Sequence, residues 1–143
     1  MRAKITFATL FVYASAVIAV TVLPIHHHRP GYWTGAPWWT VFRWIPGDVD
    51  APSFVLNVIM FIPYGVLLPL LWRATDSARR LALAAVVASA GIELLQFVLG
   101  VTLGSRRMVD VNDLIANTAG ALVGLAILRL ALPPAAHRRL IRP

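Results

Sequence analysis

The chain of 143 residues has no cysteine and carries little charge, since only 13% of its residues are Asp, Glu, Lys or Arg. The absence of cysteine excludes disulfide bonds, thiol catalysis and cysteine-ligated zinc or iron–sulfur centres. Soluble domains usually carry about 25% charged residues, so the shortage of charge argues against a soluble protein. The chain instead has 59% hydrophobic residues and a mean hydropathy of +0.74, which favours a protein embedded in a lipid bilayer.

Acidic residues are fewer than basic ones: the chain has six Asp and Glu and thirteen Lys and Arg, which gives a net charge of +7. A strongly basic chain is often a nucleic-acid-binding protein, since Lys and Arg neutralise phosphates. Here the apolar excess favours the bilayer as the partner instead. We therefore expect no nucleic acid partner.

Four apolar stretches are long enough to cross the hydrocarbon core, which takes about 20 residues of helix. They lie at roughly residues 5–25, 53–72, 81–101 and 113–132. Each is expected to be helical, because backbone polar groups in lipid find no water and must bond to one another. The sequence thus predicts an all-α membrane protein, a single domain over residues 1–143 that forms a bundle of four transmembrane helices.

The first stretch also has an alternative interpretation as a signal peptide, with Ala14-Ser15-Ala16 as a cleavage-like site. Its apolar run continues to Ile25, whereas the apolar region of a signal peptide is usually about 7–15 residues long. This length favours a transmembrane helix.

The basic residues predict an orientation, since Lys and Arg concentrate in cytoplasmic segments. Nine of the thirteen lie in the two termini and in the loop between the second and third stretches, and four lie in the other loops, namely Arg29, Arg43, Arg106 and Arg107. Both termini are therefore expected to be cytoplasmic. The loop 26–52 then lies outside, and its tryptophans favour a position along the outer membrane interface.

The run His26-His27-His28 begins this loop and has two interpretations. It could be a set of metal ligands or a pH-sensitive polar helix end. Adjacent residues on a helix point in different directions, which favours the second interpretation. We expect no metal and no cofactor.

Five polar residues inside the four stretches fall at a similar depth in the outer half of the membrane, whereas Arg129 lies in the inner half. The five are Asn57, Glu93, Gln96, Asp113 and Asn117. Spacings of three and four residues place Glu93 with Gln96, and Asp113 with Asn117, on one helix face each, and Asp110 joins the second face if it is already helical. Lipid is an unfavourable neighbour for a carboxylate, so both faces are expected to turn into the bundle.

Small residues along the last stretch favour close approach of another helix. Ala116, Gly120 and Gly124 form a stripe of the kind that brings two helix backbones together. In the short loop before this stretch, Arg106 and Arg107 precede Asp110 and Asp113, and one guanidinium can bridge two carboxylates. The alternative is that these arginines are simply solvated.

The motifs in the last three stretches resemble those of the VanZ-like family. The resemblance covers roughly residues 53–130 and rests on three ordered motifs, Asn57–Gly65, Glu93–Phe97, and the series Arg107, Asp110, Asp113, Asn117, Gly120 and Gly124. This family comprises small bacterial polytopic membrane proteins and is named for a member associated with low-level teicoplanin resistance. The resemblance implies a bacterial plasma-membrane location and a link to the cell envelope.

Our leading hypothesis is an outward-facing polar site that binds a lipid-linked or glycopeptide-like envelope component and affects glycopeptide susceptibility. In it, Arg107 holds an anionic group and the carboxylates orient the ligand. The binding residues predicted are Asn57, Glu93, Gln96, Arg107, Asp110, Asp113 and Asn117.

Three other hypotheses remain open. The first is an intramembrane enzyme acting on a lipid-linked substrate, with Glu93 as general acid or base and a divalent ion on Asp110 and Asp113. It lacks a nucleophile–base pair, because Ser89 and Ser105 have no histidine nearby in the sequence. The second is a transporter, which would need an oligomer and a full polar path. The third is a purely structural cluster that keeps the helices in register.

Overall fold

The computed structural model describes residues 2–22, 42–103 and 109–141. The described chain is almost entirely helical. Its elements in chain order are α1 (Arg2–Val22), β1 (Phe42–Arg43), α2 (Ala51–Leu71), the 3-10 helix η2 (Arg73–Asp76), α3 (Ala78–Leu103), β2 (Val109–Asp110), α4 (Val111–Ala131) and α5 (Pro134–Ile141).

Helices α1 to α4 are long and apolar enough to cross a membrane. The predicted all-α bundle of four transmembrane helices is therefore confirmed, and the chain is a multi-pass membrane protein. Each of these helices begins two or three residues earlier than predicted. Caps explain two of these starts: Asp50 accepts a hydrogen bond from the Ser53 N–H before α2, and Asp110 accepts one from the Asn112 N–H before α4.

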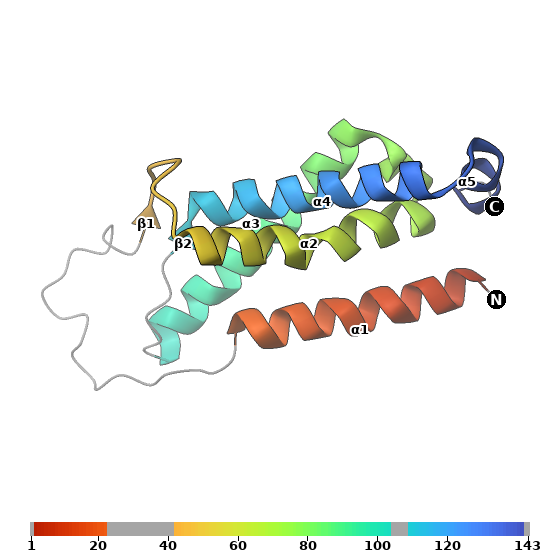
Figure 1. Ribbon diagram of the computed structural model, residues 1–143. Helices are drawn as coiled ribbons and strands as arrows, with labels where there is room; N and C mark the ends of the chain where they lie inside the picture. Colours follow the sequence, from red (N-terminus) through yellow and green to blue (C-terminus); the bar gives the residue numbers. More distant parts are fainter. Residues whose placement is uncertain (1, 23–41, 104–108, 142–143) are drawn as a thin grey trace, which may run out of the picture.

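Figure 1 shows α2 and α4 side by side along most of their length, with α3 crossing them and α1 lying to one side. We call the end with β1, β2 and the starts of α2 and α4 the sheet end, and the opposite end the terminal end. Both termini lie at the terminal end (Figure 1). The predicted cytoplasmic location of the termini remains a prediction.

The seam between α2 and α4 is a backbone-to-backbone contact. A Cβ atom added at Gly65 would overlap the Ala121 carbonyl, and one added at Gly120 or Gly124 would overlap a carbonyl of α2. Only hydrogen fits at these three positions. The small residues predicted as a stripe on the last helix thus line its contact with α2.

Helix α1 is held more loosely than the other three. Among its described side chains Val17 is the buried one, and most of the others are exposed. Hydrogen bonds to α2 and α3 attach it: Tyr13 Oη donates to the main-chain oxygen of Met60 at 2.5 Å, and Gln96 Nε2 donates to that of Thr21 at 2.9 Å. In a bilayer, the exposed apolar faces of α1 would contact lipid.

The two short strands pair in parallel, with Phe42 opposite Val109 and Arg43 opposite Asp110. This pairing was not predicted, and it corrects one expectation. Asp110 does not join the helical face of Asp113, because its backbone is extended and it caps α4 from outside. Of the predicted outer loop 26–52, residues 42–50 form β1 and the turn that leads into α2, whereas His26, His27 and His28 lie outside the described residues.

The terminal end holds a second feature that the sequence did not predict, the short helix α5. His137 Nε2 of α5 lies 3.1 Å from Asp76 Oδ2, and Arg129 Nε donates to Asp76 Oδ1 at 3.4 Å. A guanidinium N–H of Arg129 also donates to the main-chain oxygen of Asp76. Asp76 in η2 thereby joins the end of α4 to α5.

Candidate functional site

The polar residues predicted at one depth gather at the sheet end from three helices. Asn57 comes from α2, Glu93 and Gln96 from α3, and Asp113 and Asn117 from α4. Asn57 Nδ2 donates to Asp113 Oδ1 at 2.5 Å and so joins α2 to α4.

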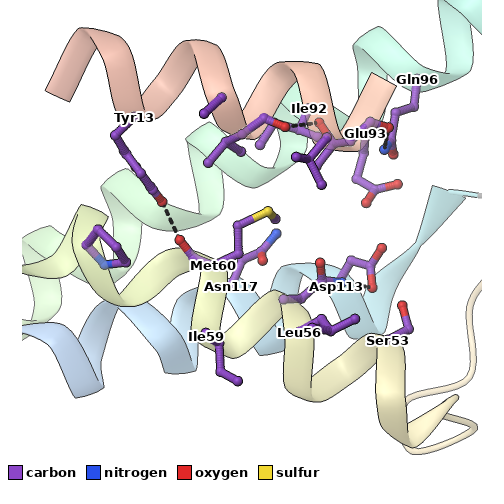
Figure 2. Close-up of a pocket in the computed structure, with 16 residues that line it drawn as sticks. Tyr13, Ser53, Leu56, Ile59, Met60, Ile92, Glu93, Gln96, Asp113 and Asn117 are labelled. Atoms are coloured by element: carbon purple, nitrogen blue, oxygen red, sulfur yellow. Dashed lines mark hydrogen bonds between the residues drawn. The ribbon is translucent and has the colours of Figure 1, made fainter. Parts of the chain in front are cut away.

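Glu93 is the most deeply buried carboxylate of this group, with 4% of its surface exposed. Its Oε2 accepts a hydrogen bond of 3.3 Å from the Asp110 backbone N–H. The Glu93 and Asp113 carboxyl groups face one another at one end of a cavity (Figure 2) and lie close enough to share a hydrogen bond. The structure thus brings Asn57, Glu93, Asp110 and Asp113 together.

Asn117 lies deeper along α4 and is also buried, with 3% exposed. Its Nδ2 donates to Ser89 Oγ at 2.8 Å, and its Oδ1 is buried without a hydrogen-bond partner in the described part of the chain. Sequence analysis considered Ser89 only as a nucleophile. In the structure, the Ser89 hydroxyl instead accepts a hydrogen bond from the Asn117 side-chain amide.

Gln96 has a different environment from the carboxylates. Its side-chain amide donates a hydrogen bond to the Thr21 carbonyl at the end of α1, and the residue also lines the cavity. The contact makes Gln96 a link between α3 and α1, a role that the sequence did not predict.

Among the described residues, the guanidinium of Arg43 in β1 contacts one of these carboxylates, that of Asp110. Its Nη1 lies 3.8 Å from Asp110 Oδ2, and its side chain is 44% exposed. Sequence analysis assigned this position to Arg107, which lies outside the described residues. Arg43 and Asp110 are far apart in the chain and meet only through the β1–β2 pairing, so no local pattern could reveal the contact.

Asn112 is a second residue that sequence analysis missed. It is 3% exposed, its Nδ2 donates to the carbonyls of Ile45 and Asp48, and its Oδ1 accepts from the Gly47 N–H at 2.9 Å. Gly47 has a φ of +95°, which favours glycine at this turn. Asn112 therefore holds the turn before α2 against the start of α4.

A cavity of about 600 Å³ lies between α1 and the other three long helices. One end is polar, formed by Asn57, Glu93 and Asp113, and the remainder is mainly apolar (Figure 2). Lining residues such as Val20 of α1 and Leu56 of α2 are 70% and 64% exposed. The cavity therefore opens sideways between these two helices.

A smaller pocket of about 270 Å³ adjoins the polar end of the cavity. Arg43, Asp50, Asp110 and Asn112 line it, and it shares Ser53 and Asp113 with the cavity. A mainly apolar cavity beside a polar, charged pocket is complementary to an amphipathic molecule.

The arrangement gives less support to catalysis than to binding. The described residues include no group of three or more His, Cys, Asp or Glu side chains placed to hold a metal ion. The Ser89 hydroxyl accepts from Asn117, and His137 lies at the terminal end. The enzyme hypothesis for Glu93, Asp110 and Asp113 remains a prediction.

The fold and the buried polar cluster define a small multi-pass membrane protein with a laterally open, amphipathic cavity. The VanZ/LLP1 family model matches residues 10–132, and the chain belongs to this family. The match includes most of α1 and the loop after it, beyond the residues that carried the resemblance. Neither the comparison with curated proteins nor the comparison with solved structures found a match.

Proposed function

We propose that this protein binds a lipid-linked component of the bacterial cell envelope, in the plasma membrane, with both termini cytoplasmic and the sheet end outward. The hydrocarbon chain of the ligand lies in the cavity between α1 and α2, and its headgroup lies in the polar pocket. One observation carries the proposal: the apolar cavity and the polar pocket adjoin and share Ser53 and Asp113.

The lateral opening supports the same proposal. A lipid enters most readily from the bilayer, and α1, which would have to move to widen the opening, has one buried side chain among those described. Mainly apolar walls with a few polar groups at one end are typical of sites that bind small amphipathic ligands.

A photoreactive phospholipid with a diazirine in one acyl chain tests occupancy of the cavity. We expect illumination of the purified protein to label cavity residues such as Met60 and Leu56. Ala16 and Ala8 are both exposed on α1, but only Ala16 lines the cavity. Ala16→Trp should lower the labelling at least fivefold, and Ala8→Trp should leave it unchanged. Equal labelling of all lipid-facing residues in every variant would refute the proposal.

The link to the envelope has its own test. Expression of the protein in a teicoplanin-susceptible bacterium should change the inhibitory concentration of teicoplanin, and Glu93→Gln should abolish the change at equal membrane levels of protein. Asp48→Asn removes the same charge from an exposed residue outside the cavity and serves as the control. Identical susceptibility with wild type, Glu93→Gln and empty vector would contradict this link.

A further inference from the structure

The four carboxylates that line the cavity or the smaller pocket divide into two pairs by what they contact. Asp50 accepts from the Ser53 N–H at 3.2 Å and Asp110 from the Asn112 N–H at 2.8 Å, so both cap helices. Helix N-termini carry partial positive charge that stabilises such carboxylates. Glu93 and Asp113 instead face the cavity (Figure 2).

Hydrogen-bond acceptors predominate at the polar end of the cavity. Glu93 Oε2 receives one long hydrogen bond from Asp110, Asp113 Oδ1 receives one from Asn57, and the two carboxyl groups also hydrogen-bond to each other. Asn117 Oδ1, on the next turn of the Asp113 face, is buried and receives none from the described residues. A buried acceptor without a partner costs about 1–3 kcal/mol, so a donor-rich ligand group is complementary to this surface.

Charge favours the same kind of ligand. The described residues that line the cavity and the pocket include four carboxylates and one guanidinium, that of Arg43. Two carboxylates close together in a medium of low dielectric repel one another, and a cation between them removes the repulsion. A ligand that offers only an anionic phosphate would add to this repulsion.

We infer that the ligand carries a primary ammonium, which binds beside the paired carboxyl groups of Glu93 and Asp113. This inference rests on the proposed function and narrows it to an amine-bearing, zwitterionic lipid. An ammonium has three N–H donors, which match the Glu93 and Asp113 carboxylates and Asn117 Oδ1.

Native mass spectrometry of the purified full-length protein, with lipids of identical acyl chains, tests this inference. The probes are phosphatidylethanolamine, phosphatidylglycerol and phosphatidylcholine, whose trimethylated ammonium cannot donate a hydrogen bond. We expect phosphatidylethanolamine to be retained at least tenfold more than either of the other two. The double variant Glu93→Gln and Asp113→Asn should lose this preference, and Asp48→Asn should keep it.

The outcomes separate the inference from the proposed function. Equal retention of the three lipids, or preferred retention of phosphatidylglycerol, would overturn the ammonium site and leave lipid binding intact. Retention of none of them, together with uniform diazirine labelling, would overturn both. The lipid comparison uses the unmodified chain, so the result does not depend on whether the double variant folds.

Discussion

Replacement of Gly65 by alanine tests whether α2 and α4 pack backbone to backbone. In the structure, the new Cβ would lie 2.7 Å from the carbonyl carbon of Ala121 and 2.9 Å from its Cα. Non-bonded carbons pack at about 3.5–4.0 Å, so the two helices would have to separate by about 1 Å. A gap of this size forfeits about a quarter to a half of the dispersion energy along the seam.

The size of the effect follows from two opposing contributions. Overpacking of a close-packed interior costs about 1–3 kcal/mol, whereas alanine recovers up to about 1 kcal/mol of helix propensity relative to glycine. We therefore expect Gly65→Ala to lower the free energy of unfolding by about 1–2 kcal/mol. Gly91 of α3 provides the matched control, because a Cβ there would meet nothing within 4 Å. Gly91→Ala should be neutral or stabilising by at most about 1 kcal/mol.

Titration of detergent-solubilised protein with sodium dodecyl sulfate, followed by far-UV circular dichroism, measures the free energy of unfolding of both variants. The two substitutions are chemically identical and differ only in what the new methyl group meets. The reasoning would be wrong if Gly65→Ala were as stable as Gly91→Ala.

Three further predictions concern the two ends of the bundle. Asn112→Ala should release the turn at residues 45–48, because the turn loses hydrogen bonds to this amide; limited proteolysis should then cut the turn faster, and an unchanged rate would contradict this role. Asp76→Asn should loosen α5 by roughly 1 kcal/mol or less, as expected for a partly exposed ion pair, and hydrogen exchange in α5 should accelerate; equal exchange would argue against the contact. Since the chain has no cysteine, Asp48→Cys should react with an impermeant maleimide added to intact cells and Ser77→Cys only after permeabilisation, whereas the reverse pattern would refute the predicted orientation.

The predictable part of the fold comes from hydropathy and helical spacing. Four apolar stretches of sufficient length have only one stable form in lipid, so the helices and their order follow from the sequence. The stripe that contains Gly120 and Gly124 likewise predicts a close helix contact, because small residues at this spacing leave the backbone uncovered. The gathering of Asn57, Glu93 and Asp113 at one end was expected, because each residue's depth follows from its position within its span.

The remainder depends on contacts between distant segments or on conformations that short patterns do not encode. Arg43 meets Asp110 through a parallel pairing of only two residues, which is too short to leave an alternation pattern. Asn112 does not share the predicted face of Asp113 and Asn117, and its partners include main-chain groups of a turn more than sixty residues earlier in the chain. The sequence left open whether Asp110 is helical; in the structure its backbone is extended, because it pairs in β2 and caps α4.

The attachment of α1 has a consequence for how this protein can vary in sequence. Tyr13 donates to the carbonyl of Met60, and Gln96 donates to the carbonyl of Thr21, so both acceptors belong to the main chain. Residues 60 and 21 can therefore change identity without loss of either hydrogen bond, whereas Tyr13 and Gln96 cannot. Paired substitutions across this contact are not required during evolution, and covariation between the helices would fail to detect it.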